Sequence, residues 1–142
     1  LSRCINFKIS LTNNESLAVA DKLLDGNLHE MINKDLINYY LTPGKIFNLA
    51  KFGKLNKYDL INFDLKQLLI VIIKNNHYKK DDLIKYLILD FIEFYFVKIN
   101  SSFSTKINDS YNYFLKRISD TRKFNLDEES LFIEFEEKIL NV

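Results

Sequence analysis

Two basic side chains in the first third of the sequence have chemistry suited to a phosphate group. Arg3 carries a planar guanidinium that stays charged and donates a fork of hydrogen bonds, which suits charge developing on a transferred phosphoryl group. Lys45 directly follows Pro43 and Gly44, where an ammonium group and the start of a helix would both favour an anion. On the residues alone, we interpret Arg3 as part of a surface ion pair and Lys45 as a solvated lysine beside a tight turn.

The other residue types that could catalyse a reaction or bind a metal have simpler explanations. His29 and His77 are far apart in the sequence, and neither has a second histidine or a cysteine four residues further on. Cys4 is the single cysteine, which excludes an internal disulfide and a cysteine-based metal cage within the chain. The sequence has no glycine-rich phosphate loop and no nucleophile elbow. It therefore predicts no metal site and no cofactor bound by this chain itself.

The composition predicts a folded helical domain in the cytoplasm. The 142 residues are 47% hydrophobic and 27% charged, which is typical of folded domains. A net charge of +1 argues against a strongly basic nucleic-acid binder. The longest apolar stretch, 83–99, contains four charged residues, so we interpret it as a buried helix rather than a membrane span. A single cysteine and the absence of a recognisable signal sequence favour a reducing compartment.

The first part of the chain is divided into short elements by glycine and proline. Residues 4–11 alternate apolar and polar side chains, which predicts an extended segment that docks one face on a partner. Thr12 or its neighbour can cap a helix that Gly26 ends. A second helix is predicted over about 28–41, and Pro43 is predicted to begin a third.

Longer helices are predicted after residue 55. Each has apolar residues three and four positions apart, the pattern of helices in a bundle. Asp81, Ser104 and Asp127 are available as N-caps. The predicted helices cover 63–75, 81–99, 105–121 and 127–140. The sequence as a whole predicts an all-α fold, a small helical domain followed by a helical bundle, with a short extended segment in front.

The tetrapeptide Leu1-Ser2-Arg3-Cys4 resembles the Ser-Arg-Cys motif that closes the ATPase domain of clamp-loader subunits of the AAA+ superfamily. In that family the motif is followed by a short extended link, a lid domain with a Ser-Pro-Gly-Arg-like turn and a helical collar domain. This chain follows the same order, with Leu41-Thr42-Pro43-Gly44-Lys45 as the turn. Its end, residues 113–117 followed by Phe124-Asn125-Leu126-Asp127, is similar to the end of delta-prime subunits.

The resemblance implies a domain order and a role in DNA replication. Residues 1–10 would end an AAA+ ATPase-like domain, 11–55 would form the lid domain and 56–142 the collar (oligomerisation) domain. The chain would then be a C-terminal fragment of a delta-prime-like subunit of the DNA polymerase III clamp loader, with lid and collar moving semi-independently. It would assemble with gamma/tau and delta subunits and act, through the complex, on the sliding clamp and primed DNA. Such a fragment would have no activity alone but would belong to a DNA-directed DNA polymerase holoenzyme.

The resemblance also implies roles for the two basic residues. Arg3 would be an arginine finger that acts in trans on ATP held by a neighbouring motor subunit. Lys45 occupies the position of the second sensor of motor subunits, a basic residue that touches nucleotide phosphates. Because delta-prime subunits generally do not hydrolyse ATP, we favour a solvated lysine over a cofactor-binding role at Lys45.

Two alternatives to a delta-prime subunit stay open. The first is a fragment of a gamma/tau-type motor subunit, whose preceding region would contain an intact phosphate-binding loop. The second is a non-enzymatic helical adaptor protein, in which the Ser-Arg-Cys triplet is accidental. The gene sequence preceding Leu1 would separate these possibilities.

Overall fold

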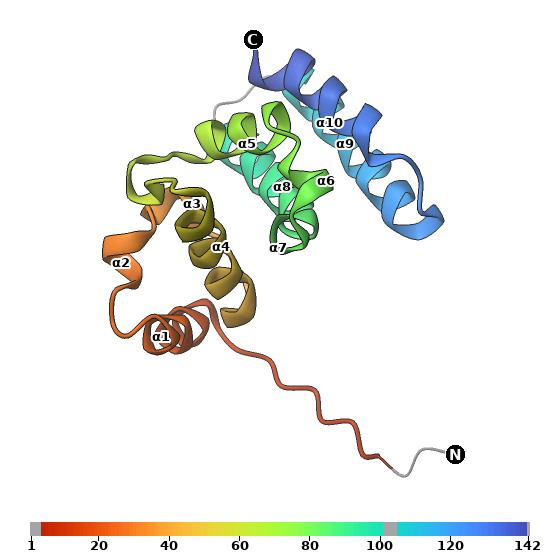
Figure 1. Ribbon diagram of the computed structural model, residues 1–142. Coiled ribbons are helices and arrows are strands. Elements are labelled where there is room, and N and C mark those ends of the chain that lie inside the picture. Colours follow the sequence, from red (N-terminus) through yellow and green to blue (C-terminus); the bar gives the residue numbers. More distant parts are fainter. Residues whose placement is uncertain (1–3, 101–104, 142) are drawn as a thin grey trace.

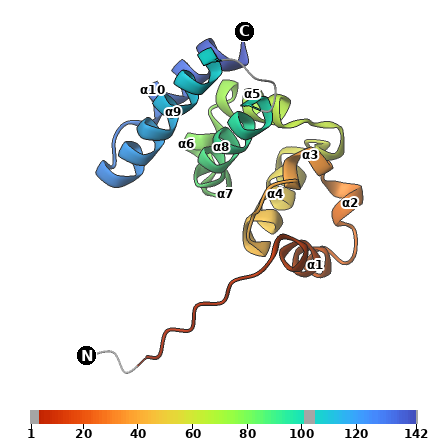
Figure 2. The ribbon, with the colours of Figure 1, turned by 180° about the vertical axis from the view of Figure 1, so that it is seen from behind.

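The computed structural model describes residues 4–100 and 105–141, with the main chain alone for 105–107. The described residues form helices without a β-strand, so the predicted all-α fold class is confirmed. Two views show three neighbouring groups, α1 to α4, then α5 to α8, then α9 with α10 (Figures 1 and 2). The helices are α1 (Asn13–Leu23), α2 (Leu28–Met31), α3 (Lys34–Ile37), α4 (Pro43–Asn56), α5 (Leu65–Lys74), α6 (His77–Lys80), α7 (Asp82–Lys85), α8 (Leu87–Asn100), α9 (Thr105–Phe124) and α10 (Glu128–Phe135). A short 3-10 turn, η1 (Leu60–Asn62), precedes α5, and a π-helical turn, η2 (Glu136–Leu140), follows α10.

The segment of residues 4–11 has no regular secondary structure and projects away from the helices (Figure 1). Its apolar side chains Ile5, Phe7 and Ile9 are 78%, 82% and 83% exposed. The segment is drawn out away from the helices, as predicted, whereas docking of one face on a partner stays a prediction. Its apolar side chains are in solvent and do not belong to the core.

Helix α1 begins with a capping box and ends near a glycine, as predicted. The Thr12 hydroxyl accepts a hydrogen bond from the Glu15 N–H at 3.3 Å, and the Glu15 carboxylate accepts one from the Thr12 N–H at 2.7 Å. After the helix, Gly26 adopts a φ of +78° and its N–H donates to the Asp21 carbonyl at 2.8 Å. Glycine adopts this left-handed conformation without the steric cost of a side chain, which explains why the chain turns there.

The prediction of a single helix over 28–41 is wrong, because this stretch forms two short helices, α2 and α3. Ile32 between them is extended, with φ −130° and ψ 129°. Asn33 then caps α3 by accepting a hydrogen bond from the Asp35 N–H at 3.0 Å. The Asn33 N–H donates in turn to the Leu60 carbonyl of η1 at 3.1 Å. The helical spacing of apolar residues continues across the break, so the sequence pattern did not reveal it.

The helix predicted over 81–99 is also interrupted, at Tyr86, between α7 and α8. Asp81 accepts a hydrogen bond from the Leu83 N–H at 2.9 Å, which confirms it as an N-cap. The predicted cap Asp127 is confirmed as well, because its carboxylate accepts from two main-chain N–H groups at the start of α10. Ser104, the third predicted cap, lies outside the described residues.

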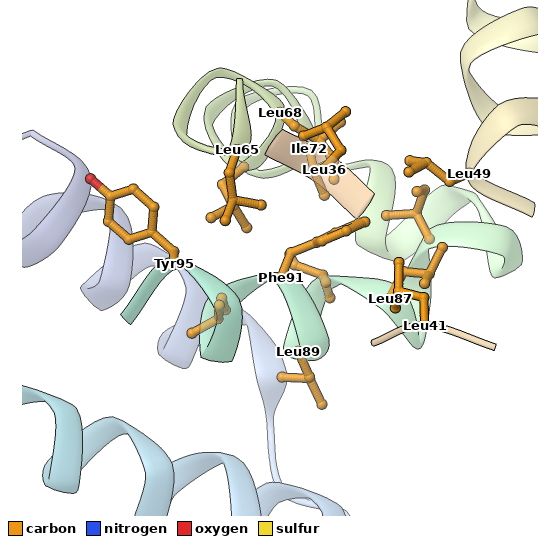
Figure 3. Packing of buried hydrophobic residues seen from close by; sticks show 14 of the residues in the cluster. Leu36, Leu41, Leu49, Leu65, Leu68, Ile72, Leu87, Leu89, Phe91 and Tyr95 are labelled. Carbon is orange, nitrogen blue, oxygen red and sulfur yellow. The ribbon is translucent and has the colours of Figure 1, made fainter. Parts of the chain in front are cut away.

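One apolar core continues across the predicted boundary between residues 55 and 56. Side chains from α3, α4, α5 and α8 point toward one another, with Phe91 of α8 close to Leu36 and Leu49 (Figure 3). Near the same boundary the Tyr39 ring stacks on the Phe94 ring, with centroids 4.9 Å apart. Any movement of one part against the other, as predicted from the resemblance, would have to separate these contacts.

The last two helices cover the opposite side of α8. Phe96 of α8 contacts Phe114 of α9 and Phe135 of α10, with ring centroids 5.6 Å apart in both pairs. Phe114 and Phe135 are themselves 5.6 Å apart, so the three rings form one buried cluster. Among the described helices, none is both long enough and apolar enough to cross a lipid bilayer.

Candidate functional site

The first turn of α4 positions Lys45, one of the two residues singled out in the sequence. Thr42 caps this helix by accepting a hydrogen bond from the Lys45 N–H at 3.3 Å. Pro43 is the first helical residue, as predicted, because its missing N–H would have no partner within the helix at that position. The cap and the proline together fix where α4 begins and therefore where the Lys45 side chain leaves the main chain.

The Lys45 ammonium group forms an ion pair across two helices. Its Nζ lies 2.5 Å from Oδ2 of Asp90 in α8, a carboxylate whose side chain is only 16% exposed. Oδ1 of Asp90 lies 3.4 Å from Nη2 of Arg122 in α9. Nη1 of Arg122 lies 3.3 Å from Oε1 of Glu93. Side chains from α4, α8 and α9 thus meet at one charged cluster.

A groove of about 600 Å³ opens beside this cluster. Its walls carry three cations, Lys45, Lys85 and Arg122, and two carboxylates, Asp90 and Glu128. Glu93, which pairs with Arg122, offsets the excess of one cation in this lining. The start of α4 at the edge of the groove is therefore what favours an anionic group there. We call it the charged groove.

The ion pair decides what Lys45 can do in this groove. The Lys45 side chain is 40% exposed, so its pairing with Asp90 is only partly shielded from water and contributes little, on the order of 0 to 1 kcal/mol. A phosphate could therefore draw Lys45 away from Asp90 at modest cost. The interpretation of Lys45 as a merely solvated lysine has to be amended, because its partner, 45 residues away in sequence, was not recognisable from the sequence pattern.

Arg3, the predicted arginine finger, lies outside the described residues. Cys4, the next residue, has an exposed side chain. The described part of the chain contains no group of three or more His, Cys, Asp or Glu side chains arranged to hold a metal ion.

Asp35 is a second charged junction that sequence analysis missed. Its Oδ2 accepts hydrogen bonds from the Leu65 N–H at the start of α5, at 2.8 Å, and from Lys98 of α8, at 2.6 Å. Burial opposes ionisation of Asp35, but the hydrogen bonds from Lys98 and Leu65 outweigh it, so the pKa of Asp35 is lowered. Asp35 and Asp90 together tie the N-terminal helices to α8.

His77 is the third polar group that the sequence did not assign. Its Nε2 lies 2.8 Å from the Tyr58 hydroxyl, and its ring packs edge-on against Phe52 with centroids 5.1 Å apart. Burial lowers the pKa of His77, with Asp81 partly opposing and Lys80 adding to the shift. The histidine thus joins α6 to the loop after α4, where it packs as a largely neutral side chain.

Comparisons of the chain with protein-family models, with curated proteins and with solved structures found no match. The charged groove and its surroundings are therefore interpreted from their own geometry.

Proposed function

We propose that this chain is part of a clamp-loader subunit of the delta-prime kind, which assembles with motor subunits and helps to load the sliding clamp during DNA replication. The proposal rests mainly on the order of features along the chain. The Ser-Arg-Cys triplet comes first, then an exposed extended segment, then short helices with a Pro-Gly turn, and finally longer helices. In this proposal Arg3 acts in trans on ATP bound by a neighbouring subunit.

The Pro-Gly turn supports the proposal because it occupies the position that the resemblance requires. Pro43 starts α4 and places Lys45 in the first helical turn, facing the charged groove. A basic residue there is the arrangement expected of a lid helix that has kept the framework of a nucleotide sensor. The ion pair with Asp90 is consistent with a subunit that does not itself hydrolyse ATP, since the lysine already has an anionic partner.

Apolar side chains left in solvent by the second half of the chain support a role in assembly. Buried interfaces between subunits require such side chains, and aromatic ones contribute strongly. Among the residues of this half whose side chains the structure describes, the exposed large apolar ones are Tyr86, Val97, Tyr113, Phe124, Leu126 and Ile133. In the proposed ring these residues would supply part of the contact between collar domains.

The role of Arg3 can be tested by reconstitution of a complete loader with motor subunits, delta, the sliding clamp and primed DNA. Arg3→Ala should lower DNA-stimulated ATP hydrolysis at the neighbouring site, by roughly 10³ to 10⁵ if the finger contributes as in other nucleotide hydrolases. Lys22→Ala, which removes an exposed cation from α1, is the control and should leave turnover unchanged. Wild-type turnover in Arg3→Ala would refute the trans-acting role.

Assembly can be tested separately by co-purification of the tagged chain with gamma/tau and delta subunits. A stable complex that survives gel filtration is the expected result. If the chain never associates with these subunits, the assignment to a clamp loader is wrong, and a free-standing adaptor becomes the better hypothesis.

A further inference from the structure

A second groove lies between α4, the end of α1 and α2. It encloses about 530 Å³ and is lined by apolar side chains and two lysines. The lining residues that matter here are Leu23, Met31, Phe47, Leu55, Lys51 and Lys54. We call it the lysine-rimmed groove, and it shares only helix α4 with the charged groove.

Three large apolar side chains that line this groove are exposed. Leu23 is 51% exposed, Phe47 is 37% exposed and Leu55 is 64% exposed. Leaving several large apolar side chains together in water is unfavourable, and contiguous patches of this kind mark interaction surfaces. Val19, one turn before Leu23 on α1, is a further 40% exposed and extends the apolar surface along that helix.

Three residues of α4 that line the groove lie in a row along the helix, and a partner helix could lie along that row. Phe47, Lys51 and Leu55 are four residues apart, so they form a single row on one face of the helix. Lys54 lies one helical turn beyond Lys51 on the same side, so the two lysines place positive charge beside the apolar side chains of Phe47 and Leu55. A groove between neighbouring helices with apolar walls is the arrangement in which an amphipathic helix binds, with its apolar face inserted.

The charges on the rim of the groove indicate which kind of partner helix it can bind. Lys51 and Lys54 are both exposed, and Asp25 in the turn after α1 is the carboxylate that also lines the groove. The lining therefore has an excess of positive charge, which attracts carboxylates and repels a basic segment. We propose that the lysine-rimmed groove binds an acidic amphipathic helix of a partner protein. The proposal does not depend on the clamp-loader assignment.

The probe for this proposal is a fluorescein-labelled synthetic peptide of about 18 residues, which forms about five helical turns. Leucines are placed three and four positions apart and glutamates flank them, while a second peptide carries lysine in place of every glutamate. The complete chain should bind the glutamate peptide at least tenfold more tightly than the lysine peptide, measured by fluorescence anisotropy. Added salt should narrow that difference because the lysines are exposed.

A charge reversal gives the sharpest test. In the double variant Lys51→Glu with Lys54→Glu, the preference should invert in favour of the lysine peptide. The same double reversal on α9, Lys116→Glu with Lys123→Glu, is the matched control and should keep the original preference. Leu55→Asp should weaken binding of the glutamate peptide at least tenfold without loss of the fold, because Leu55 is mostly in solvent.

Three outcomes would overturn the proposal. The first is equal binding of the two peptides, or no binding of either up to millimolar concentration. The second is self-association of the chain in sedimentation experiments that Leu55→Asp abolishes, because a second copy would then occupy the groove. The third is binding to anionic phosphatidylglycerol vesicles, lost in the Lys51 and Lys54 reversal, without binding of the glutamate peptide.

Discussion

Asp90 accepts contacts from cations on two different helices, Lys45 on α4 and Arg122 on α9. Its carboxylate is the least exposed member of the cluster, whereas both cations reach into solvent. Removing the carboxylate would therefore leave two positive groups near each other with less compensation. The charged groove would become more attractive to anions while its helices lost one of their connections.

We predict that Asp90→Asn lowers the free energy of unfolding by about 1 kcal/mol, because it weakens two partly exposed ion pairs. A double-mutant cycle with Lys45→Met should give a coupling energy of about 0.5 kcal/mol. Urea denaturation followed by circular dichroism measures both quantities. Asp109→Asn, at an exposed position on α9, is the control and should change stability by less than about 0.5 kcal/mol. A coupling of zero would mean that the Lys45–Asp90 contact contributes nothing in solution.

His77 should make the stability of the protein depend on pH. Because burial lowers its pKa, the unfolded chain takes up this proton before the folded chain does as the pH falls. The stabilising contribution is therefore complete above about pH 6.5, the ordinary histidine pKa, and is lost as the pH falls through the lower value of the folded state. The urea midpoint should fall between pH 7.5 and pH 5 in the wild type and fall less in His77→Gln. His29→Gln, at an exposed position, should keep the wild-type slope, and identical slopes in all three proteins would contradict the assignment.

Among the helices, α4 depends on a glycine in its interior. A Cβ on Gly53 would lie 2.6 Å from Cδ1 and 2.7 Å from Cγ of Leu60, which is 2% exposed. Close approach of η1 to α4 therefore requires a residue without a side chain. The same turn accepts the Asn33 N–H, so the contact also supports the start of α3.

Gly53→Ala should destabilise the protein by about 1 to 2 kcal/mol, because displacement of buried Leu60 outweighs the gain of about 1 kcal/mol in helix propensity. Gly44→Ala in the same helix is the matched control, since nothing lies within 4 Å of a Cβ there. It should be neutral or slightly stabilising. Thermal denaturation compares the two variants, and equal melting temperatures would show that Leu60 moves aside freely.

Helix existence was more predictable from the sequence than helix continuity. Caps such as Thr12, Asp81 and Asp127 were recognisable because their hydrogen-bonding partners lie within three residues. The break at Ile32 and Asn33 was not, because it depends on a hydrogen bond to Leu60, far along the chain. Local pattern therefore predicts local bonds, and it misses a break that a distant segment stabilises.

The candidate site was predictable only in part for the same reason. The Pro-Gly turn indicated where Lys45 would lie on its helix, and the structure agrees. Its ion pair with Asp90 and the parallel junction between Asp35 and Lys98 join residues 45 and 63 positions apart. Ion pairs over such separations leave no periodic signal, so they become visible only once the helices are packed.

At the scale of the whole molecule, the two predicted domains share one core. Leu36 and Leu68 are fully buried on opposite sides of the predicted boundary, in α3 and α5. The ion pairs of Asp35 and Asp90 cross the same boundary. In the proposed clamp-loader subunit, the lid and collar parts would therefore move together as one body.

We expect the chain to unfold in a single transition. We expect Leu36→Ala and Leu68→Ala each to lower the free energy of unfolding by about 2 to 5 kcal/mol, because they leave cavities in the shared core. Each variant should lower the melting temperature of the same calorimetric transition. Near- and far-ultraviolet circular dichroism should report one common midpoint. Two separable transitions, with each variant shifting only its own, would show instead that the parts are independent folding units.

The exposed segment of residues 4–11 has a consequence for the protein at high concentration. Alternating Ile5, Phe7 and Ile9 are spaced for strand pairing, and chains that expose such a stretch can join through it into stacked β-structure. Lys8 places a charge on the opposite face of this stretch, and that charge repels its counterpart on a second chain. Neutralising this one ammonium group would remove that repulsion and favour aggregation through the exposed segment.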